Sequence, residues 1–295
     1  MSLQPFFYRP PSEADSFIIQ TSLGCAHNKC RFCSMYRKIR FRILRVSDII
    51  SGLDTDAADL GDMVGMVTSL FLGDGSAIVM RTEQLLRVME HAHRCFPNLE
   101  RIACYGAAQH IIRKKPGELR AMRDLGLRRI HCGIETGNDT ILKRINKGCT
   151  REDFLRTGEL LFGADIELDG SIMIGIGGYD MSDANAQDTG SLLNACVPAA
   201  VRIRTFVPKL GTPMGDEYLR GEFDLLDPYA ALFELRSLVG SLVCATELRS
   251  DHWTNFAPVY GFLPKEKRRA LAVIDEALAR PLEAFRPLGI ARPDQ

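Results

Sequence analysis

The sequence has no excess of charge of either sign. Lysine plus arginine and aspartate plus glutamate each number 37 among the 295 residues, so the formal net charge is zero. Proteins that coat nucleic acid usually have a basic excess, because neutralising phosphates supplies most of the affinity. The neutral charge therefore argues against a nucleic-acid-binding protein, including one stabilised by zinc.

Long apolar segments are missing as well. Charged residues interrupt each hydrophobic stretch before the roughly 18 residues that suggest a membrane-spanning helix. The first residues contain no basic segment followed by an apolar one, so we expect no secretory signal. We therefore expect a cytoplasmic protein with no membrane partner, in which the nine cysteines are reduced.

Repeats and low-complexity tracts are absent, and the chain instead alternates between two kinds of segment. Runs rich in apolar and β-branched residues predict strands at residues 16–20, 67–72, 101–105, 129–134, 167–176 and 200–207. Segments of helical periodicity separate them, at residues 46–59, 82–95, 116–125, 151–162 and 181–196. This alternation is typical of a parallel sheet covered by helices, either open or closed into a barrel.

The alternation ends after Pro208. We expect two further helices, near residues 229–243 and 265–278, with irregular segments around them. Residues 1–214 are accordingly predicted to form one domain, and residues 215–295 a C-terminal helical extension packed on it.

Three of the nine cysteines, Cys25, Cys30 and Cys33, lie within nine residues and directly follow the first expected strand. Thiolates on one short loop can ligate three irons of a [4Fe-4S] cluster and leave the fourth iron open. Gly24 permits the sharp turn that such a loop needs. The other six cysteines form no second close-spaced set, so no auxiliary cluster is expected.

Other readings of this loop remain open at this point. Zinc could be bound by the three cysteines with His27, although the second paired knuckle of a structural zinc site is missing. A redox pair of Cys30 and Cys33 leaves Cys25 unexplained. Three unconnected cysteines on one loop would be unusual, since cysteine without a ligand role prefers burial.

The cysteine triplet, its position after the first strand and the aromatic Phe32 before the last cysteine resemble the radical S-adenosylmethionine (radical SAM) superfamily. The common family spacing places three residues between the first two cysteines. This chain has four, as some branches of the family do.

Later segments follow the family's order. Gly73, Asp74 and Gly75 resemble a glycine-rich turn whose backbone receives the methionine amino group of the cofactor. Glu135 resembles a carboxylate that contacts ribose or methionine, and Lys147 a basic residue that pairs with the methionine carboxylate. Taken alone, these features are weak, because a strand-ending turn and solvated surface charges are common.

Two further segments extend the resemblance to about residue 214. Gly175 resembles the fifth-strand segment that packs on adenine, although a buried parallel strand is the simpler reading. Arg202 and Arg204, with the turn from Gly211 to Pro213, resemble the sixth strand and the segment after it.

The resemblance implies an α/β fold, a partial (β/α)6 TIM-type barrel of parallel strands with reactive groups at their carboxyl ends. It implies an enzyme with two cofactors, a [4Fe-4S] cluster and S-adenosyl-L-methionine. The cluster would be held by the three metal-ligating cysteines. It would cleave S-adenosyl-L-methionine to a 5′-deoxyadenosyl radical, which abstracts hydrogen from a small-molecule or peptide substrate. Phe32 is counted with the cofactor-binding residues.

Residues that contact the substrate are harder to predict. Tyr105 and Gln109 follow the third strand, where the family often has a polar contact, although a buried tyrosine supporting the core is the alternative. His252 lies beside the only tryptophan, Trp253, in an irregular segment that either touches substrate or only packs. Tyr105, Gln109 and His252 are therefore candidate catalytic residues.

A basic run follows the cysteine loop, formed by Arg37, Lys38, Arg40, Arg42 and Arg45. It could dock an acidic one-electron donor such as flavodoxin or ferredoxin, or be a solvated face or a site for a substrate phosphate. Two rival functions stay open: a porphyrin-related enzyme resembling oxygen-independent coproporphyrinogen oxidases, and a non-catalytic iron-sulfur electron-transfer protein.

Overall fold

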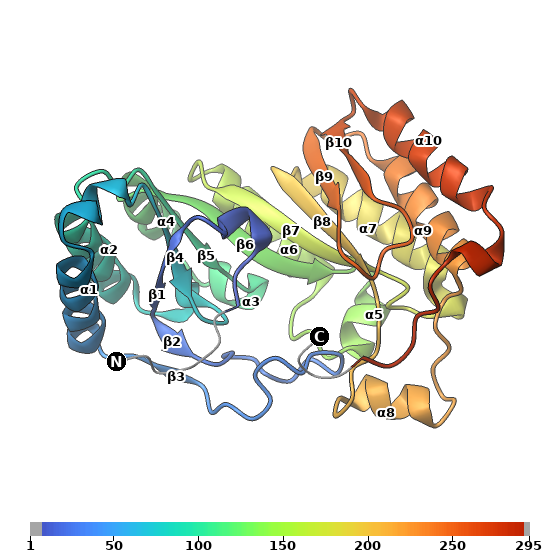
Figure 1. Cartoon of the computed structure of the whole chain (residues 1–295), viewed down its shortest axis with the longest axis horizontal. Helices are drawn as coiled ribbons and strands as arrows, with labels where there is room; N and C mark the ends of the chain where they lie inside the picture. Colours follow the sequence, from blue (N-terminus) through green and yellow to red (C-terminus); the bar gives the residue numbers. More distant parts are fainter. Residues whose placement is uncertain (1–7, 292–295) are drawn as a thin grey trace. The chain divides into compact units, whose positions relative to one another are not determined.

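A computed structural model describes residues 8–291 of the chain. The first seven residues, part of the segment expected to lack a secretory signal, lie outside this range. Eight strands are ordered β1-β4-β5-β6-β7-β8-β9-β10 in one mostly parallel sheet (Figure 1). Their bounds are β1 (Phe17–Gln20), β4 (Ser69–Gly73), β5 (Arg101–Tyr105), β6 (Leu127–Glu135), β7 (Glu167–Ile174), β8 (Ala200–Thr205), β9 (Thr246–Ser250) and β10 (Val259–Leu263). A separate antiparallel pair is formed by β2 (Ser22–Leu23) and β3 (Arg42–Ile43).

The helices alternate with the strands as expected. They are α1 (Val46–Leu60), α2 (Thr82–Cys95), α3 (Ala108–Ile111), α4 (Pro116–Asp124), α5 (Asp139–Arg144), α6 (Arg151–Phe162), α7 (Ser182–Cys196), α8 (Pro213–Leu219), α9 (Pro228–Ser241) and α10 (Lys267–Leu278). The α/β fold with a largely parallel sheet is thereby confirmed. Among the described residues, no helix is both long and apolar enough to cross a membrane.

The chain folds into two compact units. The first contains the residues up to Asn28, Lys38–Cys132 and Glu159–Leu168. The second contains Lys29–Arg37, Gly133–Gly158 and the chain from Asp169 onward. Each unit is built from separate stretches of sequence, and the predicted boundary between residues 214 and 215 stays a prediction.

In the first unit, β1, β4, β5 and β6 pair in parallel. The middle residues of strands β4 and β5 are all apolar, and Phe71 and Leu72 of β4 are fully buried. Helices α1 and α2 pack side by side (Figure 1). Helix α2 buries Leu85, Val88 and Met89, a spacing of three and four residues that places them on one helical face.

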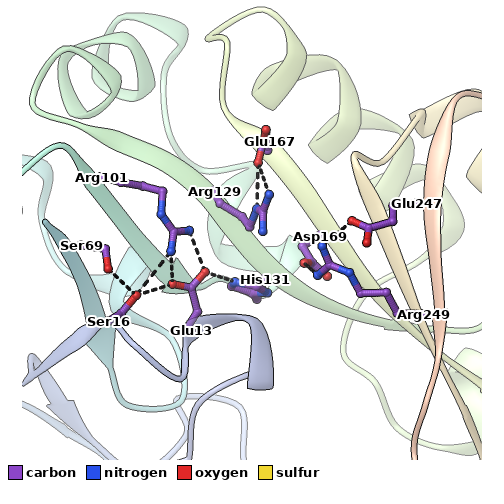
Figure 2. Close-up of polar contacts among 10 residues, drawn as sticks. All are labelled: Glu13, Ser16, Ser69, Arg101, Arg129, His131, Glu167, Asp169, Glu247 and Arg249. Carbon is purple, nitrogen blue, oxygen red and sulfur yellow. Dashed lines mark hydrogen bonds and ion pairs between the residues drawn. The ribbon is translucent and has the colours of Figure 1, made fainter. Parts of the chain in front are cut away.

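A polar network joins the segment before β1 to the starts of β4 and β5 and to the middle of β6 (Figure 2). Glu13, from a short 3-10 helix, is fully buried and accepts hydrogen bonds from Arg101 at 2.8 and 2.9 Å, from Ser16 at 2.7 Å and from His131 at 3.0 Å. Burial alone would raise the pKa of Glu13, but the bonds from His131, Arg101 and Ser16 outweigh it and lower the pKa to about 2. The carboxylate therefore stays ionised and joins strand β5 to the segment before β1.

In the second unit, the strands have one apolar and one polar face. Ile172 on β7 is paired with Ile203 on β8, and both are buried, as is Leu248 on β9. Helices α7, α9 and α10 lie side by side in this unit (Figure 1). Strand β9 is parallel to β8 and β10 is antiparallel to β9. These last two strands correct the sequence analysis, which expected irregular structure there.

Candidate functional site

In the first unit, the glycine-rich turn holds the start of the cysteine loop. The Gly24 N–H donates to the buried carboxylate of Asp74 at 3.1 Å, and the Gly75 N–H donates to the Gly24 carbonyl at 3.2 Å. A Cβ at Gly75 would lie 2.7 Å from the Gly24 oxygen and 2.9 Å from the Cα of Cys25. Glycine is therefore required at position 75 for this close approach.

Gly73 takes part in the same arrangement. Its carbonyl accepts hydrogen bonds from both the N–H and the hydroxyl of Thr21, each at 2.6 Å. A carbonyl oxygen has two lone pairs, so this oxygen is already saturated within the protein. Gly73 thus anchors the chain just before the cysteine loop.

The predicted substrate residues of the first unit lie at the end of β5 and just after it. The Tyr105 ring meets Phe71 edge-on with 5.2 Å between centroids. Gln109 follows in α3, and its buried Oε1 has no hydrogen-bond partner among the described residues. The next residue, His110, was not predicted from the sequence; its Nδ1 lies 3.2 Å from Ser76 Oγ. Burial, with nearby cationic groups, lowers the pKa of His110 to about 4, so the ring is neutral at neutral pH.

The second unit contains the other two cysteines of the loop. The Cys33 N–H donates to the Cys30 carbonyl at 3.3 Å, forming a turn. Arg37 donates to both carbonyls, at 2.8 Å for Cys33 and 3.2 Å for Cys30. The backbone of Arg31 is bonded to Ile145 and to Met214. All three loop cysteines are half-buried thiols rather than disulfides.

Glu135 and Lys147 form an ion pair in the second unit. Lys147 Nζ lies 2.8 Å from Glu135 Oε1, and the two side chains are only 12% and 6% exposed. A Cβ at Gly133 would overlap Glu135 Oε1 and come within 2.9 Å of Lys147 Nζ, so glycine makes room for the pair. Burial alone would lower the pKa of Lys147, but attraction to Glu135 outweighs it and raises the pKa above its usual range.

Two features distinguish Glu135 from an ordinary buried carboxylate. Its backbone has a φ of +66°, which is strained for a residue with a side chain. Its second oxygen, Oε2, is buried and has no hydrogen-bond partner among residues 8–291. An unsatisfied buried acceptor of this kind costs about 1–3 kcal/mol, which a bound ligand could recover by donating to it.

Phe32 lies beside this pair, with Lys147 Nζ 5.9 Å from its ring centroid. The ring packs against an apolar cluster that includes Ile145, Met173 and Met214. The structure therefore brings together Phe32, Glu135 and Lys147, three residues to which the family resemblance assigns a cofactor-binding role.

Gly175, just beyond β7, has a different partner that the sequence analysis missed. Its N–H donates to Glu234 Oε1 of α9 at 2.8 Å. Glu234 also accepts from Asn185 at 2.6 Å and from Ser182 at 2.5 Å. Burial raises the pKa of Glu234 to about 7 despite these bonds. A charged residue inside the otherwise apolar segment 230–235 was the available signal.

His252 lies in the loop between β9 and β10. Its Nδ1 is 2.9 Å from Thr254 Oγ1. Asn255 binds this loop to β8: its Oδ1 accepts from the Thr205 N–H at 2.7 Å, and its Nδ2 donates to the Ile203 carbonyl at 2.8 Å. Asn255 thus has a structural role in the segment that was predicted to touch substrate or pack.

Comparison with known families defines the class of protein. The sequence profile of the Radical SAM superfamily matches residues 19–189, more than half of the chain. The chain therefore belongs to the radical SAM superfamily. An uncharacterised protein of Methanocaldococcus jannaschii is 30% identical over 96 residues, which cover 32% of this chain. The matched segment spans only 25% of that longer protein.

Several solved structures share the fold. Coproporphyrinogen III oxidase from Escherichia coli superposes with a TM-score of 0.56 and 13% identity, covering 76% of this chain and 51% of that enzyme. Methylornithine synthase gives 0.53 and 14%, covering 94% and 71%. The methyltransferase TsrM from Kitasatospora setae, solved with cobalamin and a [4Fe-4S] cluster, gives 0.51 and 17%, covering 70% and 39%. At these identities the similarity establishes the fold.

Proposed function

We propose that the protein uses a [4Fe-4S] cluster on Cys25, Cys30 and Cys33 to cleave S-adenosyl-L-methionine and start a radical reaction on a substrate. The observation that supports this most is the Glu135–Lys147 pair, in which a strained, buried carboxylate retains one unsatisfied oxygen. Membership of the superfamily and the three thiols of the loop support the same assignment.

The residues present fit both cofactors. Three half-buried thiols are the donor set that an iron-sulfur cluster with one open iron requires. Gly75 and Gly133 leave space where any side chain would collide with the cysteine loop or with the ion pair. Glu135 Oε2 offers an acceptor suited to a ribose hydroxyl or an amino group.

When bound, the two cofactors supply one electron and a 5′-deoxyadenosyl radical that abstracts a hydrogen atom. The protein orients and shields them. Lys147 uses one N–H on Glu135 and has two more to offer to a carboxylate. Glu135 keeps this ammonium in place, and Phe32 with its apolar neighbours excludes water from the pair. We assign Gly175, whose N–H is bonded to Glu234, to binding of the adenine. The turn that contains Asp74 is assigned to holding the start of the cysteine loop.

The test is anaerobic reconstitution followed by reduction with dithionite in the presence of S-adenosyl-L-methionine and chromatography for 5′-deoxyadenosine. We expect the nucleoside to form with the wild-type protein and to disappear with Cys30→Ala, which should also lose the cluster absorbance. Cys95→Ala, which removes a half-buried thiol outside the loop, should retain both. Full iron content in Cys30→Ala would overturn the assignment.

We also propose that an acidic flavodoxin or ferredoxin delivers the electron at the basic run. The side chains of Lys38, Arg40 and Arg42 are exposed, as docking by charge complementarity requires. Charge reversal at Arg40 and Arg42 should slow reduction by the protein donor and remove its salt dependence. The rate with dithionite should be unchanged. An unaltered salt dependence would refute the docking site. We place this reducing chemistry in the cytoplasm, where thiols stay reduced.

A further inference from the structure

The strands of the second unit carry a polar face opposite their buried one. Side chains alternate along a strand, and paired residues in register share a face. Ser171 of β7 is paired with Arg202 of β8, and Arg202 with Arg249 of β9. We call this surface the polar face; its members are Asp169, Ser171, Met173, Arg202, Arg204, Glu247 and Arg249.

Two of the three arginines on the polar face are neutralised. Arg249 is paired with Asp169 at 3.5 Å and with Glu247 (Figure 2). Arg202 is paired with Asp251 at 3.0 Å. The positive charges of Arg249 and Arg202 are therefore neutralised by carboxylates of the protein itself.

Arg204 differs from both. It has no carboxylate partner among the residues that the structure describes, and its only hydrogen bond joins Nη2 to Ser171 Oγ at 3.5 Å, at the limit for such a bond. Its Nε is buried without any partner. A guanidinium group remains charged in proteins, so the half-buried side chain carries a positive charge that the described residues do not compensate.

Arg204 lies at the carboxyl end of its strand, where ligands bind in folds of this kind. It is the residue before the last of β8 and lies in register with Met173, two residues before Gly175. In α/β folds with parallel strands, ligands bind at the carboxyl ends of the strands. Burial, and after it the positive charges of Arg204 and Arg202, lower the pKa of His252 to about 4. The ring is thus neutral at neutral pH and leaves the positive potential in place.

We propose that Arg204 binds a carboxylate or phosphate group of the substrate, an inference that rests on the proposed radical SAM function for what the substrate does next. The guanidinium fork matches both anions, since it can donate two parallel N–H bonds to their oxygens. The unpartnered Nε is one of these donors. The substrate of this enzyme is accordingly an anionic molecule held by its charged end at β8.

Anion binding can be measured without turnover, on the anaerobically reconstituted protein. Potassium phosphate and potassium succinate serve as the two anions, against potassium chloride at equal ionic strength, and Trp253, the only tryptophan, reports by its fluorescence. We expect a saturable signal with at least one anion in the wild-type protein. Arg204→Met should raise Kd at least about tenfold, and Arg204→Lys should raise it less, because lysine keeps the charge without the fork.

The matched control is Arg236→Met, which removes the same charge from an exposed residue of α9 paired with Asp275. It should leave Kd unchanged. Preference for phosphate or succinate identifies the type of anionic group. The proposal is overturned if the wild-type protein shows no saturable binding, or if Arg204→Met binds as tightly. Near-UV circular dichroism checks the fold, and Arg204→Lys decides the matter if Arg204→Met does not fold.

This outcome is independent of the proposed function. Anion binding that depends on Arg204, together with no release of 5′-deoxyadenosine, would leave the anion site standing and remove the radical function. Release of 5′-deoxyadenosine without anion binding that depends on Arg204 would refute the anion site alone.

Discussion

At the scale of single residues, breaking the ion pair of Glu135 with Lys147 should lower the free energy of unfolding by a measurable amount. Lys147→Met leaves the Glu135 carboxylate, 6% exposed, without its positive partner. Removing one member of a buried ion pair costs about 3–5 kcal/mol. We expect a loss near the lower value in the free energy of unfolding, measured with urea. The double variant Glu135→Gln/Lys147→Met should lose less than Lys147→Met alone; an equal loss would show that the pair is not coupled.

Glu13 should give a distinct dependence on acid. Its pKa is about 2 in the folded protein against an ordinary 4.5, so its stabilising contribution is complete above the ordinary value and is lost as pH falls toward 2. We expect Glu13→Gln to be less stable than the wild type by about 2 kcal/mol at neutral pH. The gap should close on acidification, as measured by urea unfolding at several pH values. A gap independent of pH would contradict the assignment.

Local motifs single out candidate cofactor-binding residues in the sequence, whereas residues whose partners lie far along the chain cannot be predicted in this way. Gly75, Glu135 and Lys147 stand close in sequence to strand ends or to each other, and the structure gives each a specific partner. Glu13 meets His131 across 118 positions, and Glu234 meets Gly175 across 59. No local pattern encodes such distant contacts, so a buried charge can be noticed in the sequence but its partner cannot.

At the scale of elements, helix α9 is bonded to the turn after β7 through Glu234. The pKa of this carboxyl group is raised from 4.5 to about 7, so its contribution to stability is full below pH 4.5 and is lost as pH rises through 7. As pH rises from 4.5 to 7, we expect the free energy of unfolding of Glu234→Gln to increase relative to that of the wild type by about 3 kcal/mol. Melting temperatures measured from about pH 5 to pH 8 test this. Parallel curves for the two proteins would contradict it.

The strands show why element prediction succeeded in one part of the chain and failed in another. Strands β4 and β5 contain short apolar runs, because both faces of a central parallel strand tend to be buried. Strands β9 and β10 are five residues each, and their outward positions hold Glu247, Arg249, Tyr260 and Phe262. Strand β9, with a charge at every second position, resembles an exposed loop in sequence, and β10 is a five-residue stretch interrupted by Gly261, so both strands were missed.

At the scale of the whole molecule, the segment after residue 214 contributes strands, helices and buried apolar side chains to the second unit. It supplies α9, which packs on α7, and β9, which pairs with β8. Its buried side chains include Leu235, Leu238 and Leu248. Each large apolar side chain left exposed costs about 1.5–3 kcal/mol, and domains are stable by only about 5–15 kcal/mol.

We therefore expect a chain ending at residue 214 to be insoluble or to melt without cooperativity, as tested by circular dichroism beside the full chain. A truncated protein with a sharp thermal transition would instead show that residues 1–214 are an independent domain.

The Asn255 contacts also determine how rarely its loop opens. Four hydrogen bonds join this side chain to Thr205, Ile203 and Ser250. At about 1 kcal/mol each, releasing them together costs about 4 kcal/mol, so about one molecule in a thousand has the loop detached at any moment. The segment around Trp253 is thus held beside β8 in nearly every molecule, so a ligand that arrives at β8 meets this segment in one position.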